Sequence, residues 1–108
     1  MTQPSRLRFG HRTIRVDFTS ALPADTQGHG DHDAHLIAIS SQLDGPDAAL
    51  TLVHELLHIA IARAGGAAAL GIDETTEERI VSILSDALAE AVSRNKAAAE
   101  WAVGEMAG

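Results

Sequence analysis

The chain has 108 residues, a formal net charge of −7, 45% hydrophobic and 3% aromatic residues, and no cysteine. These values predict one domain, residues 1–108, with a modest aliphatic core, and they exclude disulfides and thiolate metal sites. The acidic balance argues against nucleic acid as a partner, because phosphate backbones are bound by clustered Lys and Arg. The sequence shows neither an apolar stretch of membrane-spanning length nor an apolar N-terminal signal segment. We therefore expect a cytoplasmic protein with no membrane partner.

The N-terminal part of the chain predicts short β-strands. In residues 6–18, apolar residues alternate with charged ones, which is typical of a half-buried hairpin with its turn at Gly10 and His11. Residues 19–33 are rich in Gly, Asp and His and predict a polar loop. Residues 35–40, with the sequence HLIAIS, predict a further short strand.

A first helix is predicted over residues 47–64, where apolar residues recur at steps of three and four. Pro46 lies where a helix can begin, and the pair Gly65-Gly66 is typical of a helix end. The wide apolar arc indicates that this helix is largely buried. A loop of small residues is expected to follow it as far as Ile72.

A second helix is predicted to begin near residues 73–76, with Thr75 and Glu78 spaced as in a capping box. The Ala-rich tail, residues 94–103, is predicted to be helical, either as a continuation of this helix or after a break at Asn95. The expected fold class is therefore α+β, with short N-terminal strands followed by two or three helices.

The first predicted helix contains His54-Glu55-Leu56-Leu57-His58, which matches the HExxH pattern. Residues four apart on a helix lie one turn above the other, so His54 and His58 can direct two imidazoles at one metal ion. Glu55 is rotated by about 100° from His54, so it reaches a metal-bound water rather than the metal. The alternative is a pair of surface histidines, but His54 and His58 border the apolar arc. The pattern predicts a Zn²⁺ site with Glu55 as general base.

A catalytic zinc usually has three protein ligands and one open position, so a third ligand is needed. We predict Glu77, because it lies on the same helical face as Ile80 and Leu84, which are expected to face the first helix. Glu78 is assigned to the capping box, and Glu74 lies outside it. Either of these glutamates, or a histidine, remains an alternative third ligand.

The segments HLIAIS, TLVHELLHIAI and EERIVSIL together resemble the minimal gluzincins. Over residues 35–88 the chain is similar to the metallopeptidase domain of the ImmA/IrrE type and to short phage-borne and archaeal relatives. In that family the second helix carries a glutamate and an apolar stripe, and Glu77 and Ile80 fall in these places. Val81 stands where thermolysin-like enzymes have a polar residue that supports a ligand histidine. The resemblance implies a zincin-like fold and a zinc metalloendopeptidase acting on a peptide or protein.

The resemblance also implies a strand above the catalytic cleft, and the strand expected at residues 35–40 takes this place. The edge of such a strand can pair with an extended peptide and hold its scissile bond over the metal.

Three further histidines, His29, His32 and His35, crowd the predicted polar loop together with Asp31 and Asp33. The simplest interpretation is a flexible polar loop in which these side chains have no particular role. Two alternatives stay open: one histidine helps to stabilise the oxyanion, or the loop forms a separate metal site.

Two functions from different classes are compatible with this pattern. The first is a zinc peptidase, and the second is a catalytically silent zincin-like module that presents its cleft or tail to a partner. The intact Glu55 favours the peptidase, because a module that only binds zinc does not need it. The short chain favours the module, because few residues remain to form specificity pockets.

Overall fold

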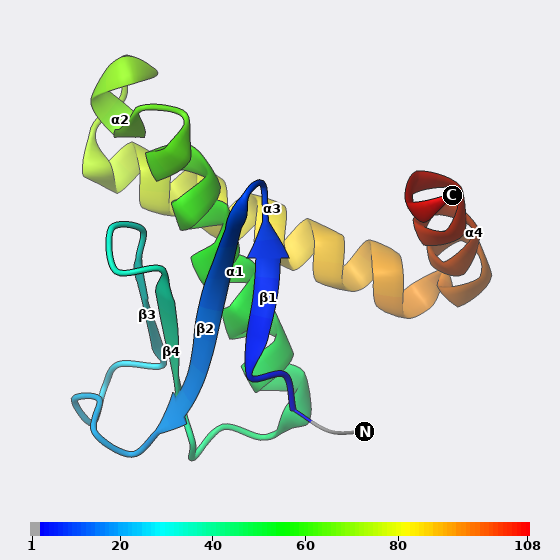
Figure 1. Ribbon diagram of the computed structural model, residues 1–108, viewed down its shortest axis with the longest axis horizontal. Coiled ribbons are helices and arrows are strands. Elements are labelled where there is room, and N and C mark those ends of the chain that lie inside the picture. The colour runs from blue at the N-terminus through cyan, green and yellow to red at the C-terminus, as the bar shows by residue number, and fades with distance from the viewer. Residues whose placement is uncertain (1–2) are drawn as a thin grey trace.

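The N-terminal half of the chain forms a four-stranded mixed sheet in the computed structural model, which describes residues 3–108 (Figure 1). Strands β1 (Arg6–Phe9) and β2 (Arg12–Thr19) form the predicted antiparallel hairpin. Its turn contains Gly10, whose φ of 65° lies in the left-handed region that glycine adopts most readily. Strand β2 also pairs in parallel with β4 (Leu36–Ser40), which confirms the strand expected at residues 35–40.

Strand β3 (Gly28–Asp31) completes the sheet, whose strand order is β1-β2-β4-β3. This strand corrects two expectations. Residues 19–33 do not form one continuous loop, because Gly28–Asp31 pair antiparallel with the apolar strand β4. Strand β4 does not lie at an edge, because it is paired with β2 on one side and with β3 on the other. The free edge on this side of the sheet belongs to β3.

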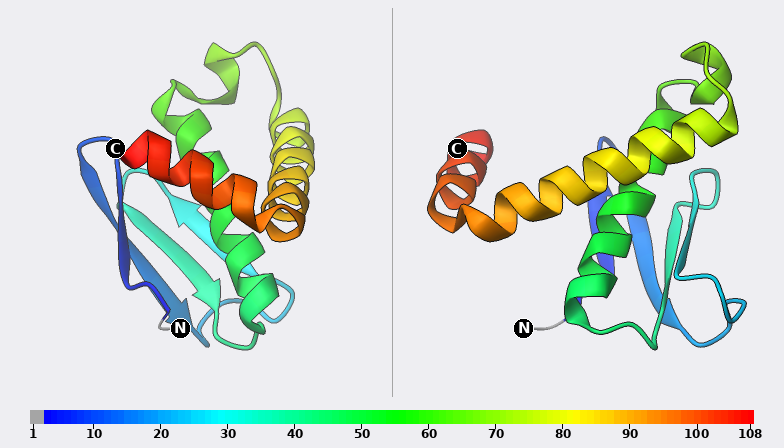
Figure 2. Two further views of the ribbon diagram at one scale, coloured as in Figure 1. Left: turned by 90° about the vertical axis from the view of Figure 1, so that its right-hand side faces the viewer. Right: turned by 180° about the vertical axis from the view of Figure 1, so that it is seen from behind.

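Helix α1 (Gly45–Arg63) lies across one face of the sheet (Figure 2). The backbone N–H of Asp47 donates to the side chain of Asp44 over 2.9 Å, and Pro46 lies in the first turn, so the start is capped as the sequence suggests. The helix ends at Arg63, shortly before Gly65 with its φ of 109°, which confirms the predicted end.

The hydrophobic core lies between α1 and the sheet. Its buried members are all aliphatic: Ile14, Val16, Ile37, Ile39, Ala48 and Ile59. Strand β3 approaches α1 closely at Gly28, where a Cβ atom would lie 2.5 Å from Cγ2 of Thr51. Only glycine fits such an approach. The glycine therefore holds the edge strand directly against the middle of α1.

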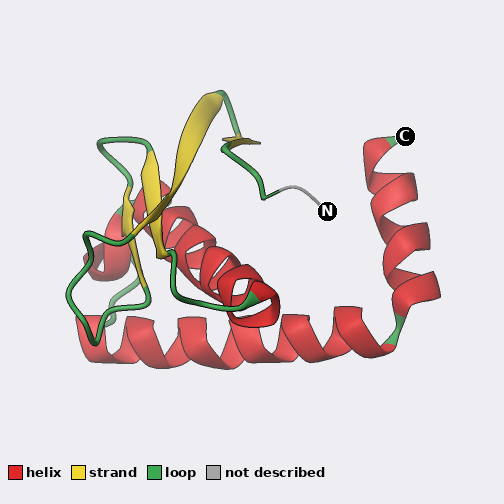
Figure 3. Ribbon diagram, turned by 90° about the horizontal axis from the view of Figure 1, so that it is seen from below, coloured by secondary structure: helices red, strands yellow, loops and turns green. Residues whose placement is uncertain are grey.

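A short helix, α2 (Gly66–Ala69), occupies part of the segment that was expected to be a loop. Helix α3 (Glu74–Arg94) then crosses α1 on the side away from the sheet. Figure 3 shows the sheet, α1 and α3 as successive layers. The contact between the two helices buries Val81 and Ser85 of α3 completely or almost completely.

The residue that caps α3 is Asp73, and not Thr75 as the capping-box pattern predicts. The backbone N–H of Thr76 donates to the Asp73 side chain over 2.7 Å, which satisfies one of the free amides of the first turn. This hydrogen bond also lowers the pKa of the exposed Asp73 carboxyl. Because the cap lies two residues earlier than expected, Glu78 has no capping role.

Helix α3 ends before Asn95, and the chain continues as helix α4 (Lys96–Ala107), which lies apart from the sheet and α1 (Figure 1). The tail is therefore a separate helix after a break at Asn95, and not a continuation of α3. Among the described residues, none of the helices combines the length and the apolar character needed to cross a membrane.

Candidate metal centre

Helix α1 presents His54 and His58 one turn apart on the side that faces α3. The centroids of the two imidazole rings are 4.9 Å apart, and about a quarter of each side chain is exposed. The spacing of four residues in a regular helix accounts for this juxtaposition. The structure thus brings together the two histidines that the HExxH pattern selects.

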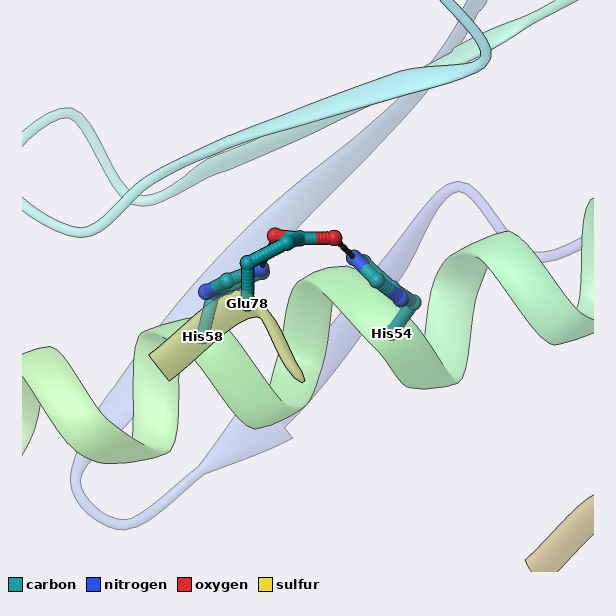
Figure 4. A group of neighbouring side chains, drawn as sticks. All are labelled: His54, His58 and Glu78. Atoms are coloured by element: carbon teal, nitrogen blue, oxygen red, sulfur yellow. Dashed lines mark hydrogen bonds and ion pairs between the residues drawn. The ribbon is translucent and has the colours of Figure 1, made fainter. Parts of the chain in front are cut away.

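The carboxylate of Glu78, on the second turn of α3, bridges these two histidines (Figure 4). Its Oε1 lies 2.9 Å from Nε2 of His54, and its Oε2 lies 2.7 Å from Nε2 of His58. One potential ligand atom from each of the three residues lies within 4.8 Å of the others. Two imidazole nitrogens and one carboxylate are therefore close enough together to bind a metal ion.

Glu77, the glutamate that the sequence favoured as third ligand, takes a different position. Its Oε2 accepts a hydrogen bond of 2.6 Å from Nδ1 of His58, the ring nitrogen that Glu78 does not contact. The physical reason is helical rotation, because consecutive residues lie about 100° apart around the helix. The cap at Asp73 fixes the start of α3, and the resulting rotation directs Glu78 at both Nε2 atoms. Glu74 is exposed in the first turn and stays outside the group.

The spacing of the three potential ligand atoms is compatible with a bound metal ion. Both ring nitrogens of His58 face carboxylate oxygens, which requires a doubly protonated imidazole when no metal is bound. Burial lowers the pKa of His58, but the hydrogen bonds to Glu77 and Glu78 outweigh it and leave this pKa raised. Tetrahedral zinc with bonds of about 2.0–2.1 Å would need its ligand atoms about 3.3 Å apart. The nitrogen–oxygen distances of 2.7 and 2.9 Å, each to a different oxygen of Glu78, are about half an ångström shorter than this spacing.

Glu55 lies on the side of α1 that faces β3. Only 8% of the residue is exposed, and its Oε2 has no hydrogen-bond partner. Burial raises the pKa of Glu55 above its ordinary value, although the charges of the neighbouring histidines act in the opposite direction. A carboxylate with a raised pKa is a better base near neutral pH than an exposed one. Glu55 is thus a free carboxylate beside the histidine pair.

Glu55 and His58 line a common cleft of about 330 Å³ between α1 and β3. The wall on the sheet side is formed by His29, Gly30 and His32. A larger cleft of about 810 Å³ opens on the other side of His58, against α2 and the start of α3. The metal centre is therefore accessible from two sides, which leaves space for a further ligand.

The three histidines of the segment before β4 do not join the metal centre. His29 lies within β3 itself, so this part of the segment is a paired strand rather than the flexible loop expected. His32 lies 3.6 Å from Asp33, and His35 adopts a φ of 53° in the turn before β4. Among residues 3–108, these histidines form no second group with metal-binding spacing. His29 and His32 reach the cleft that contains Glu55, and His35 does not.

Comparisons with known proteins identify no relative: the chain matches no protein family, no curated protein and no solved structure.

Proposed function

We propose that this protein is a zinc-dependent metallopeptidase with a minimal, gluzincin-like arrangement. The observation that carries the proposal is the bridging of His54 and His58 by the Glu78 carboxylate, on a helix whose HExxH glutamate is buried and unpartnered. Two imidazoles and one carboxylate are the ligand set of several catalytic zinc sites. A metal bound only for structure would have no use for the free carboxylate of Glu55.

In this proposal, His54, His58 and Glu78 hold the zinc. Glu77 keeps a proton on Nδ1 of His58, so that Nε2 is the nitrogen that binds the metal. Bound zinc would supply a Lewis acid that acidifies a coordinated water and polarises the scissile carbonyl. The sequence favoured Glu77 as the ligand, and the geometry favours exchanging the roles of the two neighbouring glutamates.

Glu55 acts as the general base. It removes a proton from the attacking water while the water oxygen forms its bond to the carbonyl carbon. Glu55 then donates this proton to the amide nitrogen as the carbon–nitrogen bond breaks, which releases an amine and a carboxylic acid. The partial burial of Glu55 suits both steps, because it keeps the pKa of this carboxyl above that of an exposed one.

The substrate in this proposal is an extended peptide that pairs with the free edge of β3. This strand forms one wall of the cleft that contains Glu55 and His58, whereas β4 is paired on both sides. Backbone pairing with an edge strand places a peptide in line with the cleft without requiring deep side-chain pockets. A chain of this size is suited to such recognition.

The test compares the native protein with the Glu55→Gln variant, both loaded with zinc, on an unstructured protein. The variant should retain the zinc and lose activity by a factor on the order of 10²–10⁴. Cleavage at the native rate by the variant would refute the proposed mechanism. A native protein that binds zinc but cuts no unstructured protein would instead favour the catalytically silent module.

A further inference from the structure

The C-terminal helices leave several large apolar side chains uncovered. Its exposed side chains are Leu84, Leu88 and Val92 on α3, and Trp101, Val103 and Met106 on α4. Soluble monomers seldom expose large contiguous apolar patches, and such patches mark interaction sites. The radius of gyration is 14.4 Å, whereas a compact domain of this length has about 13 Å. The position of α4 at the far end of α3, apart from the sheet and α1, accounts for the larger value (Figure 1).

Part of this surface is a groove between the first half of α1 and the last half of α3. Its volume is about 650 Å³, and its apolar walls include Leu50 and Val53 on α1 and Leu88 and Val92 on α3. The groove arises because α3 crosses α1 and extends beyond it (Figure 2). The apolar stripe of α3 includes Val81, which is buried against α1. Beyond α1 this stripe continues along α3 without another element packed on it.

Helix α4 is of the type that proteins bury. Its only charged residues are Lys96, Glu100 and Glu105, and its other residues are small or apolar, with Trp101 far around the helix from Met106. A helix that is apolar on most sides normally lies within a core. In the described structure, however, none of its residues is buried, and its main contact is a small one with α3, which directly precedes it in the chain.

We propose that two copies of the chain form a two-fold symmetric dimer, in which α4 of each copy lies in the α1–α3 groove of the other. The chain itself supplies both complementary parts, an apolar groove and an uncovered apolar helix. A two-fold arrangement repeats each contact, so a single mode of association covers both grooves and both helices. A foreign helix in the groove would leave α4 uncovered.

The dimensions suit a small, reversible dimer interface. A helix of this length is about 18 Å long and about 10 Å wide, so two such helices seated reciprocally would cover roughly 700 Å² of helix and groove surface. This area lies in the range of weak protein–protein interfaces, below the roughly 1,200 Å² of stable ones. Gly104 fits the same arrangement, because a Cβ atom at this position would meet nothing within 4 Å in the single chain. The open side of α4 can therefore receive another helix at short range.

Sedimentation and light scattering should give a mass of about 22.6 kDa, twice the 11.3 kDa of one chain. Leu88→Glu and Trp101→Glu should each raise the dimer dissociation constant at least about tenfold, since each would bury a charge in an apolar interface. Ile83→Glu is the matched control, because Ile83 is 61% exposed on the side of α3 opposite Val92. This control should remain dimeric. Circular dichroism of all three variants checks that the fold is retained.

Trp101 is the only tryptophan, so its fluorescence reports on α4 directly. Its emission should lie at short wavelength in the dimer and shift to long wavelength on dilution and in the Leu88→Glu variant. A monomer at all concentrations up to about 1 mM would overturn the proposal. So would a dimer that survives Leu88→Glu, or one in which Trp101 keeps the emission of an exposed indole. None of these results depends on zinc or on peptidase activity, so the proposed function is tested separately.

Discussion

The Glu77 carboxylate lies 2.6 Å from Nδ1 of His58, while its neighbour Glu78 contacts Nε2 of the same ring. One imidazole is therefore held by two consecutive residues of another helix. This relationship places two glutamates that sequence patterns alone do not separate at different atoms of the ring, and it leads to the first prediction.

Replacing Glu78 should weaken zinc binding more than replacing Glu77. We expect Glu78→Ala to lower the affinity by more than a hundredfold, because it removes a ligand. Glu77→Ala should lower the affinity by about ten- to a hundredfold, which is typical of a residue that orients a ligand histidine. Competition with a chromogenic chelator measures both variants. Glu77→Gln should recover part of the loss, because its amide oxygen can still accept from Nδ1. A greater loss in Glu77→Ala than in Glu78→Ala would return the ligand role to Glu77.

Zinc content should be one ion per chain in the native protein and should fall in both His54→Ala and His58→Ala. Each substitution removes one of the two imidazoles that Glu78 bridges. Added zinc should raise the melting temperature of the native protein and not that of the variants, because a ligand of the folded state stabilises it. Elemental analysis and thermal unfolding provide the two readouts. Full zinc occupancy in either variant would exclude this metal centre.

The cap of α3 should make stability depend on pH in acid. The hydrogen bond from Thr76 lowers the pKa of Asp73, so the ionised carboxylate is favoured by the folded state. Its contribution is complete above the pKa of the unfolded chain and is lost as the pH falls through the lower pKa of the folded state. Asp73→Ala should therefore melt a few degrees below the native protein at neutral pH and show a smaller difference in strong acid. In Asp73→Asn, the asparagine side chain caps the helix without ionising, so its stabilising contribution should persist at low pH.

Replacing Gly28 by alanine should destabilise the fold, whereas the same replacement at Gly30, in the same strand, should be tolerated. A Cβ atom at Gly28 would lie 2.5 Å from Thr51 Cγ2 and 3.2 Å from the carbonyl oxygen of Ala38. Gly28→Ala should therefore destabilise the fold by about 1–3 kcal/mol, the usual cost of overpacking. At Gly30 the nearest atom is 3.4 Å away, so Gly30→Ala should be close to neutral. Urea unfolding of the two variants tests the difference, and equal stabilities would contradict the close packing of β3 on α1.

Sequence patterns predicted the helices and strands that local signals specify, such as caps and apolar periodicity. Helix α1 has a cap, a continuous apolar stripe and a glycine end, and its HExxH residues were placed correctly on it. Strand β3 was missed because Gly-His-Gly-Asp has little intrinsic strand preference, and its pairing with β4 is a tertiary effect.

The choice between the two glutamates depends on a related tertiary effect. It depends on a rotation of about 100°, and that rotation depends on which residue caps α3. Asp73 and Thr75 are both acceptable caps, and Asp73 followed by Thr76 was the signal that would have separated Glu78 from the capping box.

All three proposed ligands come from α1 and α3, and none comes from the sheet. A bound ion would therefore cross-link two helices and close a loop of about twenty residues between His58 and Glu78. Closing a loop restricts the unfolded chain, as a disulfide of the same span would. This protein has no cysteine, so a bound ion would be its only cross-link of this kind. Removal of the ion should then speed amide hydrogen exchange in α2 and in the first turns of α3, while the core strands β2 and β4 keep their protection.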